Sequence, residues 1–304
     1  MHHDSMGAPF DWKQWLSDRD IPAYYLSIIR EHLPEMVFDI LRRRGQAEEL
    51  FVVGLQGAQG SGKSTLSLVL KELLQAFGFR VAVTSLDDYY LSAEQRQKLG
   101  KEVHPLLKTR GVPGTHDVEL ALQTFKSLAA GETTRLPIFD KATDNPCPQQ
   151  DWPEISEPLD CLLFEGWCVG LPDVLPAHIA KFSEPINTFE ADHDIDGVWR
   201  NYIAHANKRY QPLYDYIDYL ITLKVPNFDC VIKWRWQQEQ RLARQLTTQN
   251  RTVSVMSESQ VERFVRHFER ITIVAQQQLP RLANLIIELD TAHGFSNMLY
   301  KKRS

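Results

Sequence analysis

Residues 50–64 read Leu50-Phe-Val-Val-Gly-Leu55-Gln56-Gly57-Ala-Gln-Gly60-Ser-Gly62-Lys63-Ser64. The first six form a short continuous apolar run, which is typical of a strand buried on both faces of a parallel sheet. Residues 57–64 match the pattern G-x-x-x-x-G-K-[ST], and residues 63–77 then show the apolar spacing of a helix. A strand, a glycine-rich loop and a helix in this order form a cradle for phosphate. Loop N–H groups and the positive end of the helix dipole converge there.

This phosphate loop predicts a binding site for a nucleoside triphosphate and Mg²⁺. Lys63 is expected to bridge the β- and γ-phosphates, and the Ser64 hydroxyl to coordinate Mg²⁺. A GTPase would carry an Asn-Lys-x-Asp motif, which the sequence does not contain, and this argues against a GTPase. The expected nucleotide-binding residues are Gly57, Ala58, Gln59, Gly60, Ser61, Gly62, Lys63, Ser64 and Thr65.

Strand and helix patterns alternate along the rest of the chain. Apolar runs predict strands at residues 80–86, 135–139, 159–164, 218–225 and 285–289. Helical spacing predicts helices at residues 118–130, 197–211, 228–245 and 257–278, with long loops at residues 91–114 and 140–158. Such alternation indicates βαβ crossovers and therefore a doubly wound, mainly parallel α/β sheet.

Residues 1–46 have a different character. Residues 10–45 carry apolar side chains at helical spacing, and three arginines followed by Gly45 end the pattern. We therefore expect a helical N-terminal extension over residues 1–46 and one main domain over residues 47–304.

Composition narrows the class of protein. The chain has 304 residues, a formal net charge of −5 and 43% hydrophobic residues, as in an ordinary folded enzyme. The mild acidity argues against nucleic acid and anionic membranes as partners. Four cysteines without a CxxC pair, no apolar run of 18 residues and no targeting signal favour a cytoplasmic protein. The oligomeric state stays open.

A pair of carboxylates follows the second predicted strand, at Asp87 and Asp88. Doubly wound folds bind ligands at the carboxyl ends of their strands. Phosphoryl transfer to a hydroxyl needs one carboxylate that accepts the hydroxyl proton. If the chain stays extended here, the two side chains point in opposite directions, so only one of them faces the acceptor. The residue pattern does not decide which one is the base, and a structural role for both stays possible.

Five segments together resemble the D-glycerate 3-kinase family of plants and fungi and its bacterial relatives. That family is similar in turn to the uridine kinase, pantothenate kinase and phosphoribulokinase group. The resemblance extends from about residue 50 to residue 295. Its motifs lie at residues 57–65, 85–91, 110–117, 137–141 and 163–167.

The resemblance implies the fold of P-loop kinases and roles for individual residues. It implies that Asp87 is the catalytic base, acting with Lys63, and that Glu165 supports Mg²⁺ together with Ser64. It places further residues on the acceptor side: Asp88, Tyr90, Arg110, His116, Asp117, Asp140 and Lys141. Four of these also have a structural reading. His116 and Asp117 could serve the start of the helix at residue 118, and Asp140 could form a surface ion pair with Lys141.

A cationic lid is the last expected part of the site. Arg241 and Arg244 lie three residues apart on one predicted helix. In this kinase group such a helix closes over the γ-phosphate and neutralises charge. A solvated helix face is the alternative reading.

Together these features predict a kinase that transfers the γ-phosphoryl group of Mg-ATP to a hydroxyl of a small molecule, with D-glycerate as the leading acceptor by resemblance. Two alternatives stay open. One is a kinase for a nucleoside or a pantothenate-like acceptor. The other is an ATP-binding switch or assembly module without an acceptor.

Overall fold

The computed structural model describes residues 10–45, 49–181, 183–248 and 256–301. The chain divides into two compact units, Met1–Gly45 and Gln46–Ser304. The first unit is helical, as the sequence predicted, with α1 (Trp12–Asp18), α2 (Tyr25–Glu31) and α3 (Leu33–Arg44).

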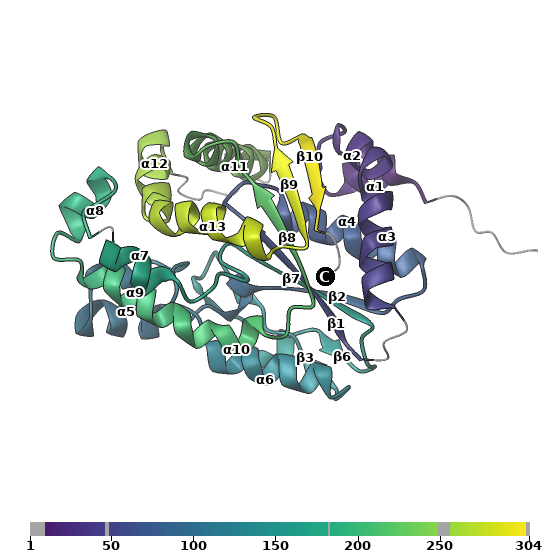
Figure 1. The fold of residues 1–304 in the computed structure, drawn as a ribbon, viewed down its shortest axis with the longest axis horizontal. Coiled ribbons are helices and arrows are strands. Elements are labelled where there is room, and N and C mark those ends of the chain that lie inside the picture. The colour runs from purple at the N-terminus through teal and green to yellow at the C-terminus, as the bar shows by residue number, and fades with distance from the viewer. Residues whose placement is uncertain (1–9, 46–48, 182, 249–255, 302–304) are drawn as a thin grey trace, which may run out of the picture. The chain divides into compact units, whose positions relative to one another are not determined.

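A six-stranded sheet forms the centre of the second unit (Figure 1). Its order is β10-β9-β8-β1-β7-β2, and every neighbouring pair is parallel except β9 and β10. The mainly parallel sheet predicted from the sequence is therefore confirmed. The strands are β1 (Phe51–Gly57), β2 (Val81–Ser85), β7 (Cys161–Gly166), β8 (Tyr219–Lys224), β9 (Leu285–Leu289) and β10 (Phe295–Tyr300).

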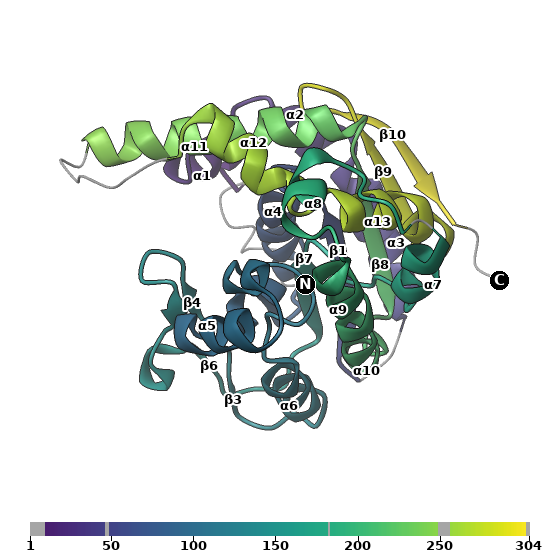
Figure 2. The same ribbon diagram turned by 90° about the vertical axis from the view of Figure 1, so that its left-hand side faces the viewer.

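Helices lie on both faces of this sheet (Figures 1 and 2). The longest is α11, whose outer end extends away from the sheet in Figure 2. The helices of this unit are α4 (Lys63–Ala76), α5 (Ala93–Glu102), α6 (Val118–Ala129), α7 (Leu175–Lys181), α8 (Thr188–His193), α9 (Val198–Asn207), α10 (Gln211–Tyr214), α11 (Phe228–Thr248), α12 (Glu258–Arg266) and α13 (Glu269–Leu282). None of the helices in the described residues is both long and apolar enough to cross a bilayer.

An apolar core joins the sheet to the helices on one of its faces. Val52, Phe164 and Leu220 come from three neighbouring strands and belong to one buried cluster. The same cluster includes Phe125 of α6 and Val274 of α13. Burial of a large apolar side chain contributes about 1.5–3 kcal/mol. The sheet edge that carries the strand ends is therefore held by a rigid frame.

Several segments differ from the prediction. Residues 91–114 are not a continuous loop, because they contain α5 and a 3₁₀ helix at Pro105–Lys108. The side chain of Ser92 caps α5 in a capping box with Gln95, a signal that lies in the sequence. The helix expected at residues 257–278 is two helices, α12 and α13, interrupted at His267 and Phe268.

The strand expected at residues 135–139 does not form either. Pro137 lacks the N–H that a continuous ladder needs, and two pairs of two-residue strands occur instead, apart from the main sheet. They are β3 (Thr134–Arg135) with β6 (Glu154–Ile155), and β4 (Phe139–Asp140) with β5 (Asn145–Pro146). The β4–β5 hairpin, residues 139–146, brings Lys141 to the side chain of Asp87.

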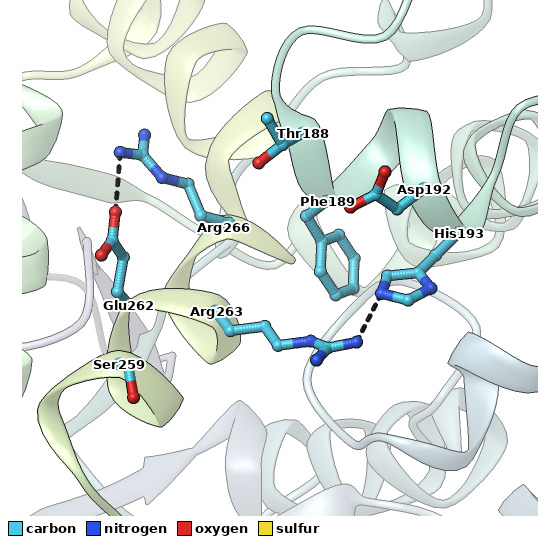
Figure 3. Close-up of a pocket in the computed structure, with 8 residues that line it drawn as sticks. All are labelled: Thr188, Phe189, Asp192, His193, Ser259, Glu262, Arg263 and Arg266. Carbon is cyan, nitrogen blue, oxygen red and sulfur yellow. Dashed lines mark hydrogen bonds and ion pairs between the residues drawn. The ribbon is translucent and has the colours of Figure 1, made fainter.

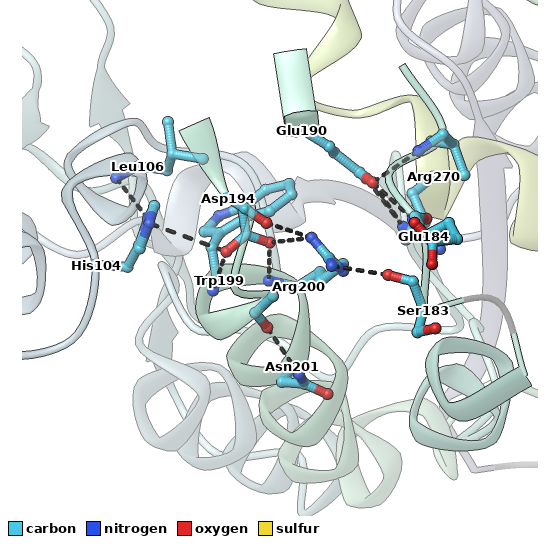
Figure 4. A network of polar contacts seen from close by, with 12 residues as sticks. His104, Leu106, Ser183, Glu184, Glu190, Asp194, Trp199, Arg200, Asn201 and Arg270 are labelled. Carbon is cyan, nitrogen blue, oxygen red and sulfur yellow. Dashed lines mark hydrogen bonds and ion pairs between the residues drawn. The ribbon is translucent and has the colours of Figure 1, made fainter. Parts of the chain in front are cut away.

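Buried ion pairs fix the segment between β7 and α9 (Figure 4). Arg270 of α13 pairs with Glu190 of α8 at 2.6 Å, and each side chain is only 1% exposed. Arg200 pairs with Asp194 at 3.1 Å in the same network. Burying a charge is costly unless it is paired, so the first pair holds α8 against α13 and the second holds α9 against the residue that follows α8.

Candidate active site

The phosphate loop connects β1 to α4 through an unusual backbone. Gly60 and Gly62 have φ values of +76° and +89°, in the region that favours glycine. A Cβ at Gly60 would also lie 2.7 Å from the Cβ of Trp234 in α11. The buried oxygens Gln59 Oε1 and Ser61 Oγ have no hydrogen-bond partner within the described part of the chain. Thr65 lies in the first turn of α4.

His293 supports this loop from the turn between β9 and β10. Its Nε2 lies 2.9 Å from the carbonyl oxygen of Gly60, and its ring packs on Trp234 with centroids 4.2 Å apart. The Trp234 indole in turn donates to the carbonyl of Thr291 at 3.2 Å. Side chains from α11 and from the turn before β10 therefore brace the loop, and the sequence alone predicted neither contact.

Glu165 lies beside the start of α4 because β7 pairs with β1. The register aligns Glu165 with Leu55, two residues before the phosphate loop. Ser64 Oγ donates to Glu165 Oε1 at 2.8 Å, and Lys63 Nζ lies 3.9 Å from Oε2. Within the described residues, the buried Oε2 accepts no hydrogen bond. A hydroxyl and a carboxylate oxygen in this arrangement fit the hard oxygen ligands that Mg²⁺ requires.

Asp87 and Asp88 point in different directions, although the chain here is a 3₁₀ turn and not extended. Leu86–Tyr89 forms that turn directly after β2. Asp88 caps it by accepting from the backbone N–H of Ser85 at 3.1 Å, and it also accepts from the N–H of Phe139. Asp87 lines the cavity beside the phosphate loop. In this turn the Asp87 carboxylate faces the cavity, and the Asp88 carboxylate accepts hydrogen bonds from the backbone.

The two carboxyl groups also differ in pKa, because their surroundings differ. Burial raises the pKa of Asp88 to about 6. Burial also acts to raise the pKa of Asp87, but the charges of Lys141 and Lys63 outweigh it and hold that pKa well below its usual range. Neighbouring carboxyl groups with different acidities are a recurring feature of acid and base catalysis.

An aromatic wall, formed by Tyr90 and the rings of His116 and Phe139 that pack on it, orients the Asp87 carboxylate. The Tyr90 hydroxyl donates to Asp87 Oδ1 at 2.6 Å. The Tyr90 ring stacks on His116 with centroids 4.7 Å apart, and His116 Nδ1 lies 2.7 Å from the hydroxyl of Tyr210. Burial lowers the pKa of His116 to about 4, so the imidazole is neutral at neutral pH. His116 is a support behind Tyr90 and does not line the cavity described below.

The remaining acceptor-side residues lie in three different settings. Arg110 lines the cavity, and its guanidinium pairs with Asp144 of the β4–β5 hairpin. Asp117 is the N-cap of α6 and accepts from the N–H of Leu120. Asp140 accepts from Ala142 N and Thr143 Oγ1 within its own turn. Arg110 therefore faces the cavity, whereas Asp117 and Asp140 serve local backbone structure.

One cavity of about 360 Å³ brings these groups together. The phosphate loop forms one side of it and the acceptor-side cations another. α11 and α12 supply side chains that the sequence reasoning missed. The lining residues are Gln59, Gly60, Lys63, Ser64, Asp87, Tyr90, Arg110, Gly111, Lys141, Glu165, Trp167, Arg235, Gln238, Glu239, Phe264 and Phe268.

The arginine that reaches the cavity from α11 is Arg235. It pairs with Glu239 one helical turn later at 2.8 Å. The predicted lid residue Arg241 is exposed and is not among the cavity residues. The side chain of Arg244 lies outside the described residues. The sequence carries no local signal for Arg235, because the packing of Trp234 on Gly60 brings this part of α11 to the cavity only in the folded chain.

A second cavity of about 350 Å³ lies between α8 and α12 (Figure 3). Arg266 pairs there with Glu262 at 3.3 Å, and Arg263 donates to His193 at 2.7 Å. These charged groups contact one another, and we assign no chemistry to this cavity.

Comparison with known proteins identifies the family. Residues 52–174 match the model of the phosphoribulokinase / uridine kinase family. An uncharacterized kinase of Schizosaccharomyces pombe is 30% identical over 227 residues, which cover 72% of this chain and 78% of that protein. The chain belongs to the phosphoribulokinase / uridine kinase family. It is therefore a P-loop kinase, and the P-loop kinase fold expected from the sequence is confirmed.

Glycerate kinases are among the relatives of this family member. The chloroplastic D-glycerate 3-kinase of Arabidopsis thaliana is 31% identical over 202 residues, covering 62% of this chain. The matched stretch spans only 41% of the plant protein. The solved D-glycerate 3-kinase of Cryptococcus neoformans is 23% identical and superimposes with a TM-score of 0.70, covering 89% of this chain and 99% of that one. This likeness supports the fold.

Proposed function

We propose that this P-loop kinase transfers the γ-phosphoryl group of Mg-ATP to a hydroxyl group of D-glycerate. One observation carries the proposal. The phosphate loop with Lys63 and the carboxylate of Asp87 line the same cavity, which is the arrangement that direct transfer to a bound alcohol requires. The glycerate kinases among the relatives support D-glycerate as the acceptor.

The phosphate loop would hold the nucleotide. Its backbone N–H groups and the dipole of α4 favour the β- and γ-phosphates, and Lys63 would bind between them. Ser64 and Glu165 would hold Mg²⁺, directly or through water. The ion supplies charge neutralisation at the transferring phosphoryl group. Arg235, which lines the same cavity, would add a further positive charge.

Asp87 would act as the base. The acceptor oxygen forms a bond to the γ-phosphorus while the bond to the β-phosphate oxygen breaks, and ADP leaves. The hydroxyl proton passes to Asp87 during this step. Tyr90 would keep the carboxylate oriented, because its hydroxyl already donates to Oδ1.

The cations on the acceptor side favour an anionic acceptor over a neutral one. Arg110 and Lys141 both line the cavity, and a carboxylate is the group that such cations recognise. A nucleoside has no charge for them to bind. This difference supports a small hydroxy acid such as glycerate over the nucleoside alternative.

Turnover of a panel of acceptors tests the proposal. Purified protein with Mg-ATP would be offered D-glycerate, glycerol, uridine, pantothenate and ribulose 5-phosphate, with ADP release as the signal. We expect release with D-glycerate and loss of that response in Asp87→Asn, which should still bind ATP. Release only with another acceptor would replace glycerate as the substrate. No release with any acceptor would favour an ATP-binding switch.

A further inference from the structure

Both oxygens of the Asp87 carboxylate are already bonded in the structure. Oδ1 accepts from the Tyr90 hydroxyl at 2.6 Å, and Oδ2 accepts from Lys141 Nζ at 2.7 Å. A carboxylate paired with an ammonium group is a weak base, because taking up a proton would cancel its attraction to the cation. Asp87 therefore needs to lose one of these contacts before it can act efficiently on an acceptor.

The Tyr90 contact is fixed by packing. Tyr90 is only 7% exposed. Its ring stacks on His116 and meets the edge of Phe139 with centroids 5.2 Å apart. Moving the hydroxyl away from Asp87 would disturb this whole aromatic wall. We expect the Tyr90 contact to persist throughout turnover.

The Lys141 contact is of the opposite kind. The Lys141 side chain is 59% exposed and extends from the turn of the β4–β5 hairpin. Among the described residues, Asp87 is the one side chain with which Lys141 forms a hydrogen bond and an ion pair. The Asp87 carboxylate is only 28% exposed, so its attraction to Lys141 is not negligible. The ammonium group can leave Asp87 when a second anion in the cavity competes for it, because its own side chain is exposed and not held by packing.

The alternative partner of Lys141 would lie in the same cavity. Arg110 lines it as well, and Arg110 is held in place by Asp144, which lies in the same turn of the hairpin as Lys141. Asp144 is held in turn by the buried Arg96 at 2.7 Å. One fixed cation and one movable cation thus border the acceptor side. An anionic group bound at Arg110 would attract the Lys141 ammonium group.

We propose that Lys141 guards Asp87, and that a bound anionic acceptor draws the ammonium group onto itself and so frees Asp87 Oδ2 for the acceptor hydroxyl. This inference rests on the proposed kinase function and adds a positioning residue to it. Two properties follow. The kinase discriminates against neutral alcohols, which cannot move Lys141. It also protects ATP from hydrolysis, because Asp87 stays paired while water alone occupies the cavity.

The variant Lys141→Met tests the guard, with Lys141→Arg as the conservative variant and Lys98→Met as the control. Lys98 is 72% exposed, and its recorded ion pair is with Glu102, 3.8 Å away on α5. For Lys141→Met we expect ATP hydrolysis without acceptor to rise about fivefold or more. We also expect the preference for D-glycerate over glycerol in kcat/KM to fall about tenfold, the effect of one lost charge contact. Lys141→Arg should keep both values near those of the wild type, and Lys98→Met should change neither.

A double substitution separates guarding from a general structural effect. In Asp87→Asn there is no base left to guard, so adding Lys141→Met should not raise acceptor-free hydrolysis. An equal rise with and without Asp87 would overturn the proposal, and so would unchanged hydrolysis in Lys141→Met. Far-ultraviolet circular dichroism checks that each variant is folded, and if Lys141→Met is not, Lys141→Gln takes its place.

The test of the guard by acceptor-free hydrolysis does not depend on which acceptor the kinase uses. Acceptor-free hydrolysis is measured with Mg-ATP alone. A rise in Lys141→Met together with no turnover of glycerate would support the guard and refute glycerate. Turnover of glycerate by the wild type, with no rise of acceptor-free hydrolysis in the variant, would support glycerate as the acceptor and refute the guard.

Discussion

Ser64 Oγ donates a 2.8 Å hydrogen bond to Glu165 Oε1, which joins the first turn of α4 to the end of β7 across 101 residues of sequence. The second oxygen of Glu165 is buried and faces Lys63 at 3.9 Å. The same carboxylate therefore touches the helix start that would hold phosphate and the hydroxyl that would hold Mg²⁺. Its charge is the feature most directly open to test.

Glu165→Gln keeps the hydrogen bond from Ser64 but removes the charge. We expect the apparent affinity for Mg²⁺ in turnover to fall about 10–100-fold, because groups that support a metal have effects of this size. Titration of activity with Mg²⁺ at saturating ATP measures it. Glu154→Gln, on the exposed β3–β6 pair, is the control. An unchanged Mg²⁺ requirement would show that Glu165 does not support the ion.

Asp87→Asn should separate chemistry from nucleotide binding. Loss of a general base lowers kcat by about 10²–10⁴-fold, whereas the phosphate loop is untouched. We therefore expect nearly normal binding of ATP, measured by calorimetry, with strongly reduced turnover. Asp88→Asn is the matched comparison, because Asp88 bonds to backbone N–H groups. We expect it to affect stability more than kcat, and the reverse pattern would exchange the roles of the two residues.

Acid should destabilise the fold through buried histidines. Burial lowers the pKa of His116 to about 4 from an ordinary value of 6.5. Between these values the unfolded chain binds a proton that the folded chain does not, so stability is lost as the pH falls from 6.5 towards 4. The full effect is on the order of 2–3 kcal/mol.

His116→Gln should flatten this pH dependence, measured as the free energy of unfolding in urea between pH 4 and 7. The slope is the readout, so an overall loss of stability does not obscure it. His267, whose pKa burial lowers to about 3, keeps its share in the variant. The control is His205→Gln, at an exposed position. A variant as acid-sensitive as the wild type would contradict the expectation.

Glu190→Gln should destabilise the protein by about 3–5 kcal/mol, because it removes the carboxylate charge that compensates the buried charge of Arg270. Urea unfolding measures the loss. Glu262→Gln removes one of two carboxylates that pair with Arg266, in a half-exposed contact, and leaves the pair with Glu269. It should cost at most about 1 kcal/mol. Equal losses at the two positions would mean that burial does not set the value of these pairs.

Much of the fold was predictable because its signals are local. The apolar run at β1, the glycines at residues 57–62 and the helical spacing of α4 lie within one short stretch. They determine the loop and its place at the end of a buried strand. Alternating strands and helices then determine a parallel sheet. The pair Asp87 and Asp88 was also visible, since it follows the second strand directly.

Only the tertiary structure decided which side chains meet. The choice between Asp87 and Asp88 depends on a 3₁₀ turn whose capping contact turns the second carboxylate to the backbone. Lys141 reaches Asp87 across 54 residues of sequence through a short hairpin. Arg235 faces the cavity because Trp234 packs on Gly60. Such contacts depend on the packing of elements far apart in the chain, and no local periodicity encodes them.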